Sequence, residues 1–168
     1  MTFRIRWAAF SLAVIVLASF ASACSTGPIE DAAAPTPTAA SQTSKDATAQ
    51  AAATLASFFA AWQAKDAKAV VSHLAEGRRG ISWQFKGLDR VVFGPITPDP
   101  GQIAGYMTNG TGFTTKASPG DIRCFKATAT FYFKNGQDGT VPNGEQLDWD
   151  WFLERDDKAG WLVTDWGY

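Results

Sequence analysis

The chain of 168 residues has little of what metal sites and disulfide scaffolds are built from: one histidine, His73, and two cysteines, Cys24 and Cys124. These are too few for a Cys2His2 finger, a multi-histidine centre or a disulfide framework. Lysine and arginine number 15 against 16 acidic residues, so the basic excess typical of nucleic-acid-binding proteins is absent. The sequence also has no glycine-rich phosphate loop and no Ser/His/Asp order that indicates a catalytic triad. We therefore expect no metal, no cofactor and no nucleic-acid partner.

The chain also lacks an apolar run long enough to cross a membrane, which needs about 20 residues. The longest run, Trp7–Phe20, follows Arg4 and Arg6 and precedes the small residues Ala21-Ser22-Ala23. A positive start, a short apolar stretch and a small-residue cleavage site are typical of a secretory signal. We therefore predict a signal peptide over 1–23 and a soluble remainder after export.

The segment Ala21-Ser22-Ala23-Cys24 resembles the lipobox of bacterial lipoproteins, although leucine is commonest at the position of Ala21. The resemblance implies that a diacylglycerol is attached to the thiol of Cys24 and that this cysteine becomes the first residue of the mature protein. Two or more acyl chains would hold the protein at the extracytoplasmic face of the cell membrane, since a single chain binds only marginally. The alternative is ordinary cleavage after Ala23, which would release a soluble protein.

Residues 24–46 are predicted to form a lipidated cysteine followed by a disordered linker. Between Ala32 and Ser41 the linker is rich in alanine, proline, threonine and serine and has no large apolar side chain to bury. Asp46 is a candidate N-cap for the helix that follows. We therefore place the folded domain at 47–168.

The folded domain begins with an alanine-rich stretch, 47–64, that contains no glycine or proline. Asp66 can cap a second, shorter helix, which we expect Gly77 to end. The pair Arg78-Arg79 after it is predicted to lie in a solvated loop. In the first helix the large apolar residues recur at i, i+3, i+4 and i+7, which predicts one buried face: Leu55, Phe58, Phe59 and Trp62.

The C-terminal part alternates apolar and polar residues with a period of two, which predicts antiparallel strands. Helices followed by such a run of strands indicate an α+β fold with the helices on one face of the sheet. The alternation also favours core positions for the tryptophans over a role in stacking on glycan. The strands are expected at 122–133, 147–154 and 161–168, with shorter edge pieces at 81–85 and 90–93.

Two parts of the chain resemble the NTF2-like superfamily, which includes modules of actinobacterial lipoproteins and of some penicillin-binding proteins. They are Phe58-Phe59-Ala60-Ala61-Trp62 with Lys65-Asp66, and the closing segments Trp149–Arg155 and Gly160–Trp166. The resemblance implies a cone, in which a curved sheet wraps a long helix and a cavity opens at one end. The candidate ligand cavity would then be lined by Phe58, Trp62, Trp149, Trp151 and Asp165.

The superfamily contains isomerases, dehydratases, transport adaptors and exported proteins without known activity, so the fold alone does not decide function. Its enzymes move protons with Asp, His or Tyr side chains in the cavity, and the candidates here are Asp165, His73 and Tyr106. Periodicity leaves two registers open for the last strand: one turns Asp165 inward, the other leaves it in water. Asp148 and Asp150 alternate with tryptophans and are expected to face solvent together.

A segment rich in proline and glycine, 94–121, reads as a long loop that either covers the mouth of the cone or is an insertion without a role. Taken together, the patterns favour a domain that binds a small ligand or an envelope protein without catalysis. One alternative is a small cavity enzyme of the isomerase or dehydratase type using Asp165 or His73. Another is an accessory module that presents a surface to wall-synthesis machinery. We expect an open cone to favour a ligand or substrate, and a cone filled by aromatic rings to favour an interaction module.

Overall fold

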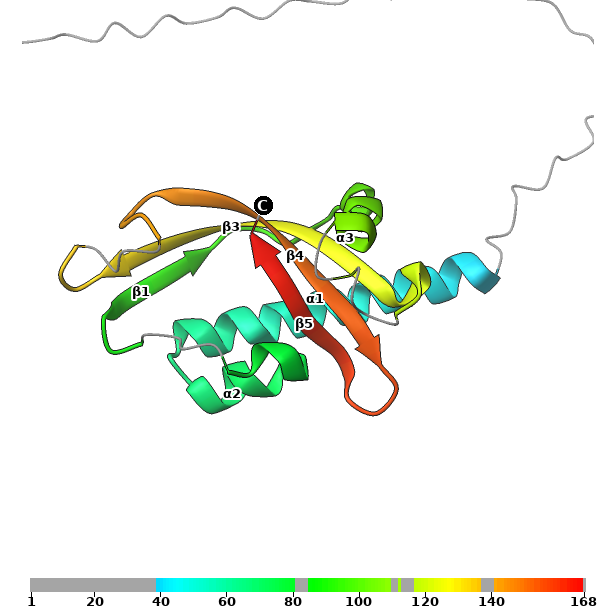
Figure 1. Cartoon of the computed structure of the whole chain (residues 1–168), viewed down its shortest axis with the longest axis horizontal. Helices are drawn as coiled ribbons and strands as arrows, with labels where there is room; N and C mark the ends of the chain where they lie inside the picture. The colour runs from blue at the N-terminus through cyan, green and yellow to red at the C-terminus, as the bar shows by residue number, and fades with distance from the viewer. Residues whose placement is uncertain (1–38, 81–84, 110–111, 113–116, 137–140, 168) are drawn as a thin grey trace, which may run out of the picture. The chain divides into compact units, whose positions relative to one another are not determined.

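A long helix lies along the concave face of a curled antiparallel sheet, and a short helix lies on the opposite face (Figure 1). The structure is a computed structural model that describes residues 39–80, 85–109, 112, 117–136 and 141–167. The predicted signal peptide, Cys24 and most of the predicted linker lie outside these residues. The described part is therefore a mixed α and β domain, as the sequence predicts. None of its helices is long and apolar enough to cross a membrane.

The first helix, α1 (Ala39–Gln63), begins before the predicted cap, so Asp46 lies inside it. Alanine has the highest helix propensity of all residues, and the stretch after Pro37 contains no further proline to break the helix. The low hydrophobicity that predicted a linker here does not prevent helix formation. The helical backbone therefore extends into the segment expected to be disordered.

The second helix, α2 (Ala67–Ser72), begins where predicted, because the Asp66 carboxylate accepts a hydrogen bond from the amide of Ala69 at 3.0 Å. It ends at Ser72, and Gly77 lies instead in the 3₁₀ turn η1 (Glu76–Arg78). The cause is a contact distant in sequence: the His73 carbonyl accepts from the amide of Val163 at 2.8 Å. The chain leaves the helix to pair with the last strand.

The sheet consists of β1 (Leu88–Phe93), β3 (Ile122–Phe133), β4 (Gln146–Asp156) and β5 (Gly160–Gly167), in that spatial order. A two-residue strand, β2 (Thr97–Pro98), also pairs with β3, and every pairing between strands is antiparallel. The predicted run of the last three strands is confirmed, and the predicted edge piece 90–93 is part of β1. The piece predicted at 81–85 falls outside the described residues, apart from Phe85.

The main core fills the space between α1 and the concave face of the sheet. The predicted helical face is confirmed, since all four of its large side chains are buried. They pack against the odd-numbered residues of β3 and β4, which point to the same side of the sheet. Each fully buried side chain of this size contributes about 1.5–3 kcal/mol. The core residues from the sheet include Phe125, Ala127, Ala129, Phe131, Trp151 and Leu153.

The described part of the segment 94–121 is more ordered than a loop. It contains β2, the turns η2 (Pro100–Gln102) and η4 (Pro119–Asp121), and the helix α3 (Ile103–Asn109). The helix α3 covers the convex face through a second hydrophobic cluster of Tyr106, Ile122, Cys124 and Phe152. The described part of the segment thus packs on the face opposite α1. This packing also explains why Phe152 interrupts the polar positions of β4.

Gly94 joins β1 to β2 where the chain passes very close to β3. Its amide donates to the carbonyl of Thr128 at 2.9 Å. A Cβ atom at this position would lie 2.3 Å from the Thr128 hydroxyl oxygen, which is closer than such atoms approach. Only glycine fits at this crossing unless the Thr128 side chain turns away or β3 moves.

Candidate functional site

The last strand contains a bulge that decides where Asp165 points. Leu153 pairs with Val163, whereas the preceding residue Phe152 pairs with Asp165, so Thr164 is an extra residue in β5. Trp161 and Val163 therefore face α1 before the bulge, and Trp166 faces it again after the bulge. Cross-strand partners share a face, so Asp165 lies with Phe152 on the convex side. Neither of the two uniform registers considered from the sequence is present.

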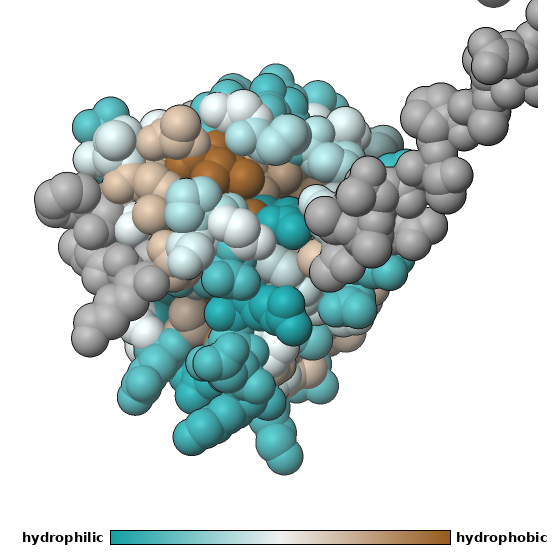
Figure 2. Space-filling view, turned by 90° about the vertical axis from the view of Figure 1, so that its right-hand side faces the viewer, coloured by the Kyte–Doolittle hydropathy of each residue, from teal (hydrophilic) through white to brown (hydrophobic). Residues whose placement is uncertain are grey.

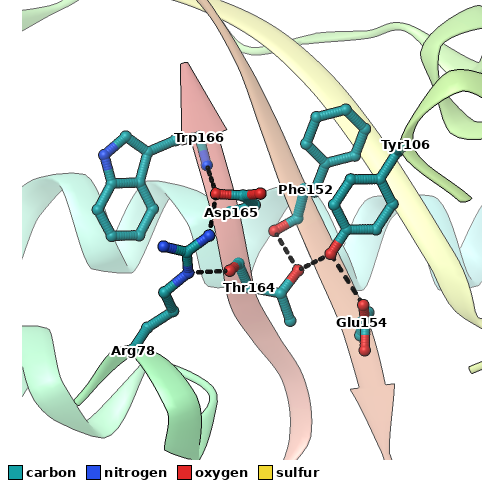
Figure 3. A network of polar contacts seen from close by, with 7 residues as sticks. All are labelled: Arg78, Tyr106, Phe152, Glu154, Thr164, Asp165 and Trp166. Atoms are coloured by element: carbon teal, nitrogen blue, oxygen red, sulfur yellow. Dashed lines mark hydrogen bonds and ion pairs between the residues drawn. The ribbon is translucent and has the colours of Figure 1, made fainter. Parts of the chain in front are cut away.

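Asp165 is buried, with 5% of its surface exposed, and forms an ion pair with Arg78 from the turn η1 (Figure 3). The same guanidinium donates through Nε to the carbonyl of Thr164 at 2.8 Å and lies 5.7 Å from the ring centre of Trp166. The backbone amide of Trp166 donates to the same Asp165 oxygen at 3.1 Å. Arg78, predicted to be solvated, thus fastens η1 onto the outer edge of the sheet.

Tyr106 continues this set of polar contacts on the convex face (Figure 3). Its hydroxyl donates to the Glu154 carboxylate at 2.9 Å and lies 3.0 Å from the hydroxyl oxygen of Thr164. Its ring stacks on Phe152 with 4.1 Å between ring centres. Burial, reinforced by the nearby carboxylate of Glu154, raises the pKa of Tyr106 well above its usual range. The phenol is therefore a hydrogen-bond donor at physiological pH and not a proton acceptor.

A shallow groove of about 280 Å³ lies beside these contacts, between η1 and the β4–β5 turn. Its walls carry charges of both signs, which suits a polar or charged partner better than an apolar one. Figure 2 shows that hydrophilic residues cover much of this end of the molecule, with a hydrophobic area near the top of the view. The residues lining the groove are Ala75, Glu76, Arg79, Glu154, Arg155, Asp156, Ala159, Leu162 and Thr164.

Four of the five candidate cavity residues come together in the main core. Phe58 is fully buried, and its ring centre lies 5.4 Å from that of Trp62 and 6.0 Å from that of Trp151. Trp149 is partly buried, 5.5 Å from Trp151. The indole nitrogen of Trp151 donates to the carbonyl of Ala127 at 3.2 Å, so its polar atom is satisfied. Asp165 lies on the opposite face of the sheet from this cluster.

The remaining titratable candidates lie elsewhere. His73 caps the C-terminus of α2 and is half-buried, and this burial lowers its pKa. Cys124 faces the second cluster beneath α3, where burial raises the pKa of its thiol to about 12. Asp148 is exposed as predicted, but Asp150 is buried, because the polar face of β4 is partly covered by the segment before and within α3. Cys24 falls outside the described residues.

Sequence reasoning did not find the partners of Asp165 and Tyr106. Arg78 is 87 positions from Asp165, and Tyr106 is 58 positions from Thr164. No local spacing indicates contacts over such distances. The contacts depend on the burial of Tyr106 and on the bulge at Thr164. Neither feature can be predicted from the periodicity of the sequence.

A family model described as a domain of unknown function, DUF4829, matches residues 52–167, from within α1 to the end of β5. This match covers well over half of the chain and includes both the aromatic core and the polar contacts around Asp165. No significant match to a curated protein or to a solved structure was found. The chain therefore belongs to the DUF4829 family of domains of unknown function.

Proposed function

We propose that this chain is an exported lipoprotein, held at the extracytoplasmic face of the cell membrane by acyl chains on Cys24. The support is the order of its first 24 residues: positive charge, a short apolar run, small residues and then cysteine. We further propose that its domain is an NTF2-like cone. A curled antiparallel sheet around a long aromatic-faced helix supports that relationship.

In this proposal the domain binds a partner and does not catalyse a reaction. The observation that carries it is the position of Asp165, which is turned away from the aromatic interior and paired with Arg78. A cavity isomerase or dehydratase needs a carboxylate or imidazole that faces bound substrate and exchanges its proton. The described interior instead presents ring-to-ring contacts among Phe58, Trp62 and Trp151. This filling favours recognition on the surface over a small ligand held inside the cone.

The groove between η1 and the β4–β5 turn is the surface best suited to a protein partner from the cell envelope. It carries Glu76, Arg79, Glu154 and Arg155 within a short span, so it can pair with charges of either sign. Two of its residues, Glu154 and Thr164, are held in place by Tyr106. Rigidly held charges lose less conformational entropy on binding than mobile ones.

The anchor is tested by metabolic labelling with a fatty acid. We expect label on the wild-type protein and on Cys124→Ser, and none on Cys24→Ala, which should accumulate as an unprocessed precursor. Equal labelling of the wild-type protein and Cys24→Ala, or release of the unacylated mature protein into the culture fluid, would refute the anchor.

The binding surface is tested by placing a photo-reactive amino acid at Leu162, which lines the groove, in cells that produce the protein. The same amino acid at Val92, which is 48% exposed on β1, is the matched control. We expect a discrete cross-linked envelope protein from position 162 only, and its loss in Glu154→Arg. Cross-linking at neither position, or equally at both, would reject the groove as the binding surface.

A further inference from the structure

A second polar site lies on the convex face, where β3 and β4 run side by side. Lys126 on β3 pairs with Asp150 on β4, and Thr128 pairs with Asp148. Directly opposed residues of an antiparallel pair share a face and have Cβ atoms about 4.5–5.5 Å apart. Residues two apart on one strand also share a face. The side chains of Lys126, Asp148 and Asp150 therefore gather on one patch of the outer surface.

Asp150 is the unusual member of this patch. Only 8% of its surface is exposed, and its Oδ1 atom has no hydrogen-bond partner among the described residues. Burial raises the pKa of this carboxyl, and the neighbouring Asp99 acts in the same direction while Lys126 opposes it. A buried carboxylate oxygen without a donor is costly, and most such groups in proteins are paired. The fold thus buries the Asp150 carboxyl group and leaves one of its oxygen atoms without a hydrogen-bond donor among the described residues.

The patch opens into a groove of about 320 Å³, which is large enough for a small organic molecule. Lys126, with about half of its side chain exposed, lies 3.7 Å from Asp99 across this groove, measured from Nζ to Oδ2. Asp99 and Asp148 line this groove together with Lys126, whereas Asp150 does not line it and is the cross-strand partner of Lys126. The residues lining the groove are Pro95, Thr97, Pro98, Asp99, Lys126, Ala127, Thr128 and Asp148.

We propose that this groove binds a small organic cation, an ammonium or guanidinium group, which offsets part of the negative charge of Asp99, Asp148 and Asp150. The incoming cation pairs with Asp99 and Asp148 at the groove wall. Lys126, on its flexible four-carbon stem, then turns from Asp99 toward Asp150, its direct partner across the strands. The ligand and Lys126 together then offset two of the three negative charges.

Other ligand classes fit this groove less well. An anion would meet the two carboxylates of Asp99 and Asp148 against the single ammonium group of Lys126. A metal ion needs several converging ligands, and no group of three or more His, Cys, Asp or Glu side chains in the described part of the chain is arranged to hold one. The groups facing Asp150 from its neighbours are Lys126 and Cys124 on β3, Asp99 before η2 and Asp148 on β4, while its β5 partner, Gly167, has no side chain.

This site shares no lining residue with the groove beside β5, so it stands whether or not that groove binds a protein. Cation binding at this site would also explain why the carboxylate of Asp150 is buried without a hydrogen-bond donor to its Oδ1 atom among the described residues. A group that is poorly satisfied in the unbound state is typical of sites where stability is given up for binding. Removing the charge of Asp150 should therefore weaken binding without weakening the fold.

The proposal is tested by calorimetric titration of the full mature chain carrying Cys24→Ser. The probes are Nα-acetyl-arginine amide (arginine amide below), its neutral isostere Nα-acetyl-citrulline amide (citrulline amide below), and a blocked Gly-Arg-Gly peptide. We expect arginine amide or the peptide to bind one to one and citrulline amide to bind at least tenfold more weakly. Tighter binding of the peptide indicates an arginine side chain of a protein as the ligand, and tighter binding of arginine amide indicates a free small molecule.

Two variants and a control complete the test. Asp150→Asn keeps the size of the side chain and removes its charge, and we expect it to lower the affinity for the cation at least tenfold while unfolding at the same or a higher urea concentration. Asp148→Asn, at an exposed position, should lower it severalfold, and Asp157→Asn in the β4–β5 turn should leave it unchanged. Absence of cation binding to the wild-type groove, equal binding of citrulline amide, or undiminished binding in both Asp148→Asn and Asp150→Asn would overturn the proposal.

Discussion

Arg78 and Asp165 form an ion pair that joins the turn after α2 to the last strand of the sheet. The pair works together with the backbone bonds of His73 and Ala75 to Val163, so the outer edge of β5 is covered around Val163 and Thr164. At the opposite edge, the side chains of Gln63 and Lys65 donate to carbonyls of β1. Uncovered strand edges invite pairing with other chains, and covering them keeps a sheet from associating edge to edge. The grooves beside β5 and on the convex face are therefore better candidates for binding a partner than the edges of the sheet are.

Replacing Arg78 by alanine should lower the free energy of unfolding by about 3 kcal/mol, because it leaves the buried Asp165 carboxylate without its cation. Arg155→Ala, at an exposed position on β4, is the control and should change stability by less than about 0.5 kcal/mol. Urea unfolding followed by tryptophan fluorescence measures both. Equal effects of the two substitutions would show that the ion pair does not stabilise the fold.

Removing the hydroxyl of Tyr106 by substitution with phenylalanine should cost about 1 kcal/mol, since Glu154 and Thr164 lose one hydrogen-bonding partner. The stacking on Phe152 is kept in this variant, so α3 should remain on the convex face. Tyr132 lies on β3, and the control variant Tyr132→Phe should leave the free energy of unfolding unchanged. An equal loss in both variants would contradict a specific role for the Tyr106 hydroxyl.

Gly94→Ala should destabilise the protein by about 2 kcal/mol, because its Cβ would press on the hydroxyl of Thr128 at the β1–β2 crossing. Gly80→Ala is a matched control, since no atom lies within 4 Å of the Cβ built at that position. The unfolding temperature of Gly94→Ala should therefore lie clearly below that of Gly80→Ala. A neutral Gly94→Ala would mean that the Thr128 side chain or β3 moves aside without cost.

The thiol of Cys124 should react slowly in the folded protein, because burial raises its pKa to about 12. At pH 8 the thiolate fraction is then on the order of a thousandfold below that of an ordinary cysteine. Alkylation with iodoacetamide, followed at the Cys124 peptide by mass spectrometry, should accelerate by at least that factor in urea. Fast labelling in buffer would reveal frequent opening of α3.

The stability difference between Asp150→Asn and the wild-type protein should grow with pH. Burial raises the pKa of Asp150 in the folded state, so the folded chain holds this proton more tightly than the unfolded chain does. The stabilisation from the protonated carboxyl is complete below the unfolded pKa and is lost as the pH rises through the folded one. Urea unfolding between pH 3 and pH 7 should show that the free energy of unfolding of the wild-type protein falls relative to that of Asp150→Asn as the pH rises. A difference that stays constant with pH would contradict the raised pKa of Asp150.

Much of the architecture followed from local patterns. The aromatic face of α1 was predicted correctly because residues three and four apart in a helix must share a face, whatever surrounds them. The long strand β3 was predicted for the same kind of reason, since side chains alternate along any strand. The start of α1 was missed because the composition that predicts a linker is also rich in the best helix former, alanine.

The amino-acid sequence by itself determined that a helix with one aromatic face would meet a sheet of alternating strands. The tertiary structure alone decided the face of Asp165 and the burial of Asp150. One inserted residue, Thr164, shifts β5 so that Trp161 and Trp166 both point inward. The burial of Asp150 depends on a segment that returns across the convex face from far away in the chain. Periodicity describes neighbours along the backbone, and it contains no information about bulges or about what packs over a face.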